Sequence, residues 1–523
     1  MPANAAAQSI AYKSTAGRWV LGVAIAGSGM AFLDSTIVNV ALPAIGRDFD
    51  ASTSSLQWIL NGYLLTLASL ILLGGSLGDR YGRRRVFVVG TGLFTVASLL
   101  CAIAPTVEIL IAARFVQGIG GALLTPGSLA MIESSFQRKD RARAIGAWSG
   151  LTGVVSALGP LLGGYLIEAV SWRAAFLINL PIGAFVMLTA RHVPETRDPT
   201  AGGPLDVRGA LLAALALGGT TYALIEGPGR GMAPAIVLTA VVGVVALAAF
   251  VLAERRSSNP MLPLGIFASR QFSAANLVTF VVYAALGGTF FLLVAFLQIS
   301  LHYSPIAAGA ALLPQTALML LLSARSGALA QRIGPRIPLT VGPLLIAAGM
   351  LLMARIDPGD SYAASVLPGV IVFALGVTLV ASPVTATALA AVDESHAGLA
   401  SGVNNAVARV ANLLAVAVLP VIAGITGNRF YDSAAMTHGF HIAMPTLAAL
   451  AAAGGVLAWL TISDDALAAE PERRGEPPVA VPTDYSCSVA GPPWRSAGGH
   501  APAAQAALPT NSAATEATPS VSR

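Results

Sequence analysis

Charged residues are scarce in this chain. Asp, Glu, Lys and Arg make up 11% of its 523 residues, whereas hydrophobic residues make up 55%. A soluble domain carries about 25% charged residues. A water-soluble fold of this size could not hide so much apolar surface, so a soluble enzyme and a dedicated nucleic-acid-binding protein are excluded. The composition instead predicts a polytopic membrane protein.

Cysteine and lysine are nearly absent as well. The two cysteines, Cys101 and Cys487, lie far apart and in no metal-ligand spacing, so we expect no disulfide framework and no metal site. Neither of the two lysines, Lys13 and Lys139, follows a glycine, which excludes a phosphate-binding loop and a self-contained ATP-driven pump of that type. The sequence also lacks a His-Glu-x-x-His motif, and we predict that the chain is not an enzyme.

Fourteen apolar segments are each long enough to cross a bilayer, which takes about 20 residues. The predicted spans lie near residues 18–43, 54–76, 84–104, 107–130, 143–169, 173–190, 207–226, 233–253, 272–300, 303–325, 337–355, 362–385, 400–426 and 440–462. The fold class that follows is an all-α membrane protein with fourteen transmembrane helices.

Arginine and lysine are unevenly distributed between the predicted loops. Even-numbered loops, counted from the N-terminus, carry seventeen of these residues, and odd-numbered loops carry five. Cytoplasmic loops are enriched in Lys and Arg. We therefore predict a multi-pass protein of the cell membrane with both termini cytoplasmic. Residues 1–17 form a short N-terminal segment, and the Pro-, Ala-, Ser- and Gly-rich stretch at 463–523 is predicted to be a disordered tail.

A weak internal repeat divides the spans into two halves. The stretch Gly75-Ser-Leu-Gly-Asp-Arg-Tyr-Gly-Arg-Arg, placed between spans 2 and 3, aligns with Gly327-Ala-Leu-Ala-Gln-Arg-Ile-Gly-Pro-Arg between spans 10 and 11. Repeated halves around a midplane site are typical of transporters. We therefore predict one six-helix bundle at 18–190, two inserted helices at 191–271, and a second six-helix bundle at 272–462.

Asp34 lies near the middle of the first predicted span. A carboxylate there costs about 2.5–3.5 kcal/mol on insertion scales, so it is expected to face a polar cavity and to mark a functional site. The alternative is a hydrogen bond between packed helices with no role in transport.

Arg114 lies within span 4, and Gln117 shares its helical face three residues later. An arginine in a span needs an acceptor, either a carboxylate or backbone carbonyl groups. It can act on a neighbouring carboxylate or simply tether two helices, and the two interpretations are compatible.

The stretch between spans 2 and 3 has glycines that permit a tight reversal and charged residues that can form a latch between two halves of the protein. The alternative is an arginine cluster that only sets topology. The residues of this gating motif are Gly75, Asp79, Arg80, Gly82, Arg83 and Arg84.

Span 5 carries small residues at helical spacing together with a proline, which together favour close helix approach and a bend. Ordinary transmembrane packing explains the same pattern. The residues concerned are Gly159, Pro160, Gly163 and Gly164.

Span 13 is unusually polar. Asn405, Arg409 and Asn412 share one helical face, and Asn404 precedes them. This stripe could line the central cavity or lie between the two halves. The cavity candidates from the whole sequence are Asn39, Gln117, Asn404, Asn405 and Arg409.

Together these segments resemble the major facilitator superfamily, and more narrowly its fourteen-span drug:proton antiporter branch, the EmrB/QacA type. The resemblance rests on Leu33-Asp34-Ser-Thr36-Ile-Val-Asn39-Val-Ala-Leu-Pro43, on the gating motif, on Arg114 to Gly121, on Gly159-Pro160-Leu-Leu-Gly163-Gly164, and on Ser171 to Gly183. It covers roughly residues 18–462. Val155 departs from the pattern, because the antiporter motif usually has a glycine there.

The resemblance implies alternating access around a site between two bundles. Asp34 would take up a proton from outside and release it inside, Arg114 would control this proton binding, and Asp79 would gate together with Arg80 and Arg84. No cofactor is implied, because the proton gradient supplies the energy. The partners would be protons, the bilayer and a lipophilic substrate. The second-half span at 303–325 holds no acid, which favours monovalent or neutral substrates, and we expect a monomeric functional unit.

Other functions remain open at this point. A dedicated exporter of one secondary metabolite, lipid or siderophore fits the same residues as a multidrug exporter. A non-transporting membrane sensor is less favoured, because no soluble signalling domain is visible in the sequence. A nutrient importer is disfavoured by the antiporter motif of span 5.

Overall fold

The computed structural model describes residues 10–198, 202–231, 233–393 and 397–467. The predicted tail at 463–523 lies almost wholly outside these residues, and so does most of the predicted N-terminal segment at 1–17. The described residues contain no strand, and their only β-type pairing is an isolated bridge between Ile10 and Phe136.

Fourteen helical segments of the described chain are long and apolar enough to cross a bilayer, which confirms the predicted number. The first six are α1 (Thr15–Phe49), α2 (Thr53–Tyr81), α3 (Arg83–Ala102), α4 (Val107–Ser135), α5 (Arg138–Ala169) and the combined α6, α7 and η1 (Ala174–Leu177, Asn179–Thr189, Ala190–His192). Next come α8 (Val207–Arg230) and α9 (Pro234–Arg256). The last six are α10 (Arg270–Ile299), α11 with α12 (Pro305–Ala310, Leu313–Ile333), α13 (Arg336–Met353), η3 with α14 (Tyr362–Val366, Leu367–Ala390), α15 (Ala397–Ile422) and α16 (Ser433–Thr461).

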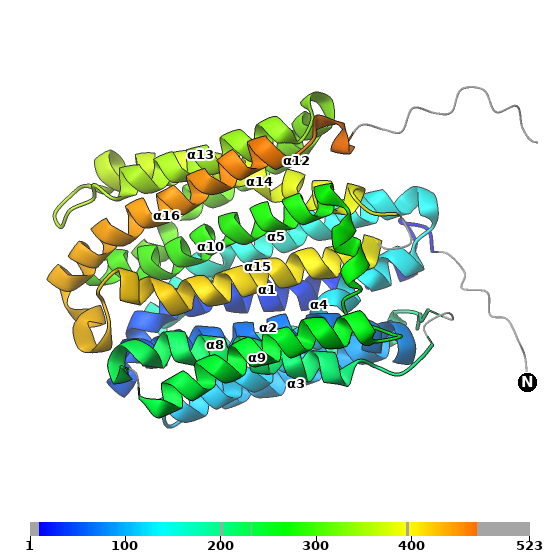
Figure 1. The fold of residues 1–523 in the computed structure, drawn as a ribbon, viewed down its shortest axis with the longest axis horizontal. Coiled ribbons are helices and arrows are strands. Elements are labelled where there is room, and N and C mark those ends of the chain that lie inside the picture. The colour runs from blue at the N-terminus through cyan, green and yellow to red at the C-terminus, as the bar shows by residue number, and fades with distance from the viewer. Residues whose placement is uncertain (1–9, 199–201, 232, 394–396, 468–523) are drawn as a thin grey trace, which may run out of the picture. The chain divides into compact units, whose positions relative to one another are not determined.

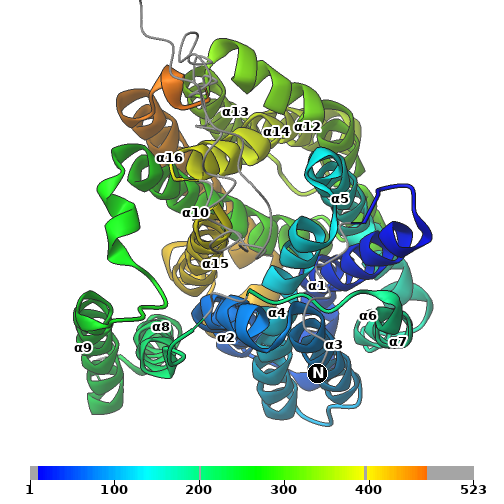
Figure 2. The ribbon, with the colours of Figure 1, turned by 90° about the vertical axis from the view of Figure 1, so that its right-hand side faces the viewer.

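The segments form two groups that run side by side along the long axis of the molecule (Figure 1). In the first group α4 packs against α2 and α3, and α1 packs against α5. In the second, α13 packs against α14 and α16, and α10 packs against α15 and α16. The groups meet where α2 contacts α15, where α5 contacts α11 and where α1 contacts α10. Helices α8 and α9 pack on each other at the edge of the molecule, with α8 against α2 and α15 (Figure 2).

The internal repeat has a structural counterpart in two glycines that join helices. The expectation of a loop over the Gly75–Arg85 stretch is wrong, because α2 continues to Tyr81 and α3 begins at Arg83. Only Gly82 lies between them, with φ +110°, and Gly334 with φ +83° lies at the corresponding junction, where Pro335 follows it before α13 begins. Such positive φ values strain any residue with a side chain. A carboxylate also occupies the space that a side chain would need at each glycine, Glu195 at Gly82 and Asp464 at Gly334.

The two groups of helices are fastened together at one end of the molecule. We call the end of the molecule where α1 begins and α16 finishes the terminal end. The contacts that fasten the two groups lie at the opposite end. Gln57 Nε2 donates to the carbonyl oxygens of Val416 (2.7 Å) and Ala417 (2.9 Å). Gln298 Nε2 donates to the carbonyl of Val40 at 3.0 Å, and the Tyr431 hydroxyl donates to the carbonyl of Ala51 at 2.9 Å. These side chains close the molecule at the end opposite the termini.

Candidate functional site

A buried ion pair joins α1 to α4 inside the first group of helices. Arg114 Nη1 lies 2.6 Å from Asp34 Oδ2. The side chain of Asp34 is 0% exposed and that of Arg114 is 1% exposed. Gln117, one turn after Arg114, accepts a hydrogen bond from Arg114 Nη1 at 2.6 Å and donates one to Asp34 Oδ1 at 2.8 Å. The structure thus brings together three residues that the sequence singles out.

Three further groups complete this site, and sequence reasoning did not assign them to it. Asn179 Nδ2, from α7, donates to Asp34 Oδ1 at 3.0 Å. Ser98, from α3, accepts from both Asn179 (3.2 Å) and Gln117 (2.9 Å). The Nε group of Arg114 donates to the carbonyl oxygen of Ile59 on α2 at 2.9 Å. Five helices therefore position the carboxylate. The one sequence feature that could have identified part of this site is Asn179, an amide residue within an otherwise apolar span.

The hydrogen-bond pattern suits an ionised carboxylate. Each partner of Asp34 is a donor: Arg114 on one oxygen, Gln117 and Asn179 on the other. A buried ion pair is stable only when such additional hydrogen bonds satisfy it. The ring of Tyr63 covers the guanidinium of Arg114, whose Cζ lies 4.5 Å from the ring centre. Protonation of Asp34 would remove one charge of the pair and replace an acceptor with a donor.

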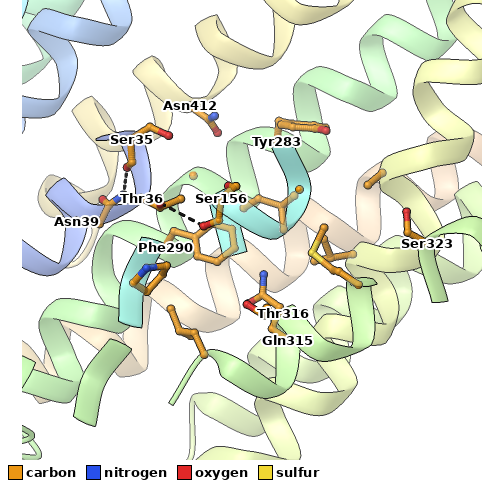
Figure 3. A pocket seen from close by; sticks show the side chains of 18 of the residues that line it. Ser35, Thr36, Asn39, Ser156, Tyr283, Phe290, Gln315, Thr316, Ser323 and Asn412 are labelled. Carbon is orange, nitrogen blue, oxygen red and sulfur yellow. Dashed lines mark hydrogen bonds between the residues drawn. The ribbon is translucent and has the colours of Figure 1, made fainter. Parts of the chain in front are cut away.

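A cavity of about 790 Å³ lies between the two groups of helices, beside the ion pair. Arg114 and Tyr63 form part of its wall. Ser35 and Thr36, which follow Asp34 in the chain, also line it (Figure 3). The cavity extends towards the terminal end, because it is lined by residues in the parts of α5, α12 and α14 that lie nearer to that end. Examples are Gly146, Ser323 and Ser382. The cavity is therefore closed at one end by the contacts between the groups and reaches towards the other.

The structure separates the five cavity candidates. Asn39 and Arg409 line the cavity. Gln117 lies behind the wall in the Asp34 site. Asn405 accepts a hydrogen bond from Arg409 Nε at 3.3 Å and is not one of the lining residues. Asn404 differs from the expectation more clearly, because its amide points to α10.

The contacts of Asn404 explain this difference. Its Nδ2 donates to Thr279 at 2.9 Å and to Asn276 at 3.3 Å. Consecutive residues on a helix point about 100° apart, so Asn404 and Asn405 cannot share a face. Arg409 and Asn412 thus follow the first alternative left open by the sequence, because they line the cavity. Asn404 follows neither alternative, because it lies between α10 and α15 of the same group.

The glycines of α5 permit close packing at the end opposite the termini. A side chain at Gly159 would collide with Thr36, and one at Gly163 with Ile37, both on α1. Gly164 lies against the backbone of Pro305 and Ile306, which begin α11 in the other group. Pro160 contacts the same helix through its carbonyl oxygen, which lies against Gly309. This motif therefore fits both the α1 contact and the contact between the two groups.

Val155, the departure from the glycine pattern of α5, is accommodated by the opposite helix. Its side chain packs on Gly29 of α1, where a Cβ atom would lie 3.1 Å from Val155 Cγ1. The space is therefore provided by a glycine on α1 instead of one on α5.

The residues of the gating motif lie at the terminal end. Asp79 pairs with Arg83 of the same motif at 2.8 Å, and not with Arg80 or Arg84. Arg80 donates to the carbonyl oxygen of Gly203, and Arg84 donates to the carbonyl of Val193 at 2.8 Å. Gly75, within α2, lies opposite Pro126 of α4. In this conformation the motif therefore contacts the segment before α8, of which residues 193–198 and 202–206 are described. Its hydrogen bonds and ion pairs with described residues lie within the first group of helices and this segment.

Glu195 is an acid of this region that sequence reasoning missed. Its carboxylate accepts from the backbone N–H of Arg84 at 3.0 Å, lies 3.4 Å from Arg84 Nε and 3.7 Å from Arg85 Nε. It caps the start of α3, where an acid interacts favourably with the helix N-terminus. The described residues hold no group of three or more His, Cys, Asp or Glu side chains that could bind a metal ion.

Comparison with known proteins shows which family and which solved structures this chain resembles. The Major Facilitator Superfamily profile matches residues 24–416. The Multidrug resistance protein Stp of Mycobacterium tuberculosis is 38% identical over 399 residues, covering 75% of this chain and 73% of that protein. The Methylenomycin A resistance protein of Streptomyces coelicolor is 38% identical over 451 residues, covering 86% and 92%. The solved structure of the POT family transporter PepTSo has a TM-score of 0.63 at 15% identity, covering 85% of this chain and 97% of that one, a likeness of fold.

Proposed function

The chain belongs to the Major Facilitator Superfamily of transporters, and we propose that it is a proton-coupled antiporter that exports lipophilic drugs or other toxic small molecules. Membership makes it a multi-pass membrane transporter and not an enzyme. Two relatives that are each 38% identical to this chain over the aligned residues are named for resistance, one to multiple drugs and one to methylenomycin A. A transporter confers resistance when it moves the drug out of the cell.

The observation that carries the proton-coupling proposal is the Asp34–Arg114 pair. It is the one ion pair between described residues in which both side chains are almost fully buried. An ionisable residue inside a membrane is costly and marks an ion or substrate pathway by default. Arg114 belongs both to this pair and to the cavity wall. A proton on Asp34 and a substrate in the cavity can therefore act on the same guanidinium.

We propose the following cycle. The excess of Arg and Lys in the even loops favours cytoplasmic termini, so the cavity of this conformation reaches towards the cytoplasm. With Asp34 ionised, the protein takes up its substrate from the cell. After the helices rearrange and the cavity opens outward, a proton from outside neutralises Asp34 and the substrate leaves. The return to the conformation seen here releases the proton inside.

The proton gradient supplies enough energy for this exchange. One charge that crosses 100 mV provides about 2.3 kcal/mol, and one pH unit adds about 1.4 kcal/mol. Together these support a substrate gradient of roughly 500-fold if one proton is exchanged for one neutral substrate. No cofactor is required, and the cavity lies within one chain, which supports a monomeric functional unit.

The gating motif acts in the part of this cycle in which the cavity opens outward and the terminal end closes. Asp79 and Arg83 already pair within the motif, while Arg80 and Arg84 contact the segment before α8. We propose that these residues form contacts across the two groups of helices when the terminal end closes. A dedicated exporter of one metabolite remains the second candidate, because one relative carries the name of a single antibiotic.

Transport into inverted membrane vesicles tests the proposed function. We expect vesicles that contain the protein to accumulate several fluorescent lipophilic dyes when their lumen is acidified, and a protonophore to abolish this accumulation. Vesicles from cells without the protein are the control. Accumulation that survives the protonophore would contradict proton coupling. Failure of the well-expressed protein to move any dye of the panel would contradict broad specificity and favour the dedicated exporter.

A further inference from the structure

The cavity wall has an unbalanced charge. Among the described residues that line it, two are arginines, Arg114 and Arg409, and none is Asp, Glu, Lys or His. The charge of Arg114 is balanced by Asp34 at 2.6 Å. Arg409 has no such partner, because no carboxylate of the described residues forms an ion pair with it. Within the part of the chain that the structure describes, the cavity wall therefore carries one uncompensated positive charge.

The surroundings of Arg409 leave its guanidinium available to a ligand. Its Nε donates to Asn405 Oδ1, one turn earlier on α15, at 3.3 Å. Its Cζ lies 5.7 Å from the ring centre of Phe32 on α1. These contacts orient the side chain across the gap between the two groups of helices, and no hydrogen bond to another described residue uses its two terminal amino groups. A guanidinium in this state presents paired donors that match a carboxylate.

Two amides in the same wall add unpaired acceptors. Asn412 lies one turn after Arg409, and its Oδ1 is buried with no hydrogen-bond partner among the described residues. Gln315 on α12 also lines the cavity, and its Oε1 is unpaired in the same sense. Figure 3 shows both side chains at the cavity. A buried acceptor without a donor is unfavourable, so these oxygens are suited to hydroxyl or N–H groups of a bound molecule.

The rest of this wall is apolar and aromatic. Tyr283, Leu286 and Phe290 of α10 and Met319 of α12 line it. Such a wall binds the hydrophobic body of a ligand, while a few polar groups fix its orientation. The position of the charge at one point of an apolar wall selects amphipathic molecules.

We propose that the cavity selects lipophilic organic anions, such as aromatic molecules with a carboxylate or phenolate group, and that Arg409 binds the anionic group. This inference rests on the proposed function and narrows its substrate class. In a cavity with low-dielectric walls, a single sign of charge concentrates ligands of the opposite sign and repels those of the same sign. Lipophilic cations are therefore the least favoured substrates.

Equilibrium binding of three matched probes to the purified full-length protein tests the proposal. The probes are 1-pyrenebutyrate, its neutral amide 1-pyrenebutyramide, and the cation 1-pyrenebutylamine. Quenching of tryptophan fluorescence by pyrene reports each Kd. We expect the wild type to bind the anion at least about tenfold more tightly than the amide, and the cation most weakly. Arg409→Gln removes this preference by weakening the anion about tenfold, while the Kd of the amide changes less than about twofold. Arg409→Lys retains part of it, because the charge remains.

The control is Arg355→Gln, which removes an exposed arginine outside the cavity lining and leaves the preference intact. Equal affinity for anion and amide, a preference that survives Arg409→Gln, or no binding of any probe would overturn the proposal. Movement of the same probes into acidified vesicles separates it from the proposed function. If the amide is transported but no anion preference exists, the anion site is wrong and proton-coupled export stands. If the anion binds at Arg409 but no probe moves, the proposed function fails instead.

Discussion

Asp34→Asn is expected to abolish proton-driven accumulation of substrate. The roughly 500-fold gradient that one proton can support falls to about onefold, because an amide cannot take up and release a proton. Exchange of labelled for unlabelled substrate across the membrane persists, since the cavity and the helix contacts that close it are unchanged. The measurement compares acid-driven uptake with substrate exchange in vesicles reconstituted with the purified variant.

Asp48→Asn is the matched control for this variant. It makes the same chemical change on the same helix, but the side chain of Asp48 is 45% exposed and is bound to Trp172 and Arg173 at the far end of α1. We expect acid-driven uptake by Asp48→Asn to stay within about twofold of the wild type, as is usual for exposed pairs. Proton-driven uptake by a well-folded Asp34→Asn variant would show that another group couples the proton.

Arg114→Met is expected to destabilise the protein strongly. It removes the partner of a carboxylate that is 0% exposed and leaves Gln117 without its donor. Breaking a buried ion pair from one side costs about 3–5 kcal/mol, because the remaining charge is buried without compensation. Thermal unfolding in detergent, followed with a thiol-reactive dye that labels the buried Cys101 as it becomes exposed, should show a midpoint lower by roughly 3–5 °C.

The double variant Asp34→Asn/Arg114→Met separates lost charge compensation from lost packing. Without the carboxylate no buried charge remains, so most of the lost stability is expected to return, although transport does not. Residues in direct contact show such non-additive effects. Additive losses in the double variant would contradict a tightly coupled pair and indicate that Arg114 acts mainly through its contacts with Ile59 and Tyr63.

The centre of the site is visible in the sequence for a simple physical reason. Charged residues are rare inside membrane spans, so Asp34 and Arg114 stand out against their apolar neighbours, and Gln117 follows from helical periodicity. Ser98 does not stand out, because hydroxyl groups are common in membrane helices, where Ser98 Oγ can bond to the carbonyl oxygen of Phe94 in the preceding turn (2.8 Å). Its role emerges only when α3 is placed beside α4 and α7.

Other features depend on tertiary packing, which periodicity does not determine. The sequence predicts the number of spans, but it places a loop over the polar ends of α2 and α3. The charged residues there hide the fact that both helices continue. Helical spacing placed Arg409 on a polar face, but only the structure shows that this face meets the cavity while Asn404 turns to α10. The pairing of Asp79 with Arg83 instead of Arg80 or Arg84 is likewise known only from the structure.

The most direct test of proton antiport is proton movement driven by substrate alone. Vesicles reconstituted with the protein are loaded with a transported dye, diluted into dye-free buffer at the same pH, and followed with an internal pH indicator while an ionophore clamps the membrane potential. The account predicts that dye efflux acidifies the vesicle lumen in the wild type, and that Asp34→Asn vesicles release dye without any pH change. Dye efflux through the wild type with no acidification would contradict proton exchange at Asp34.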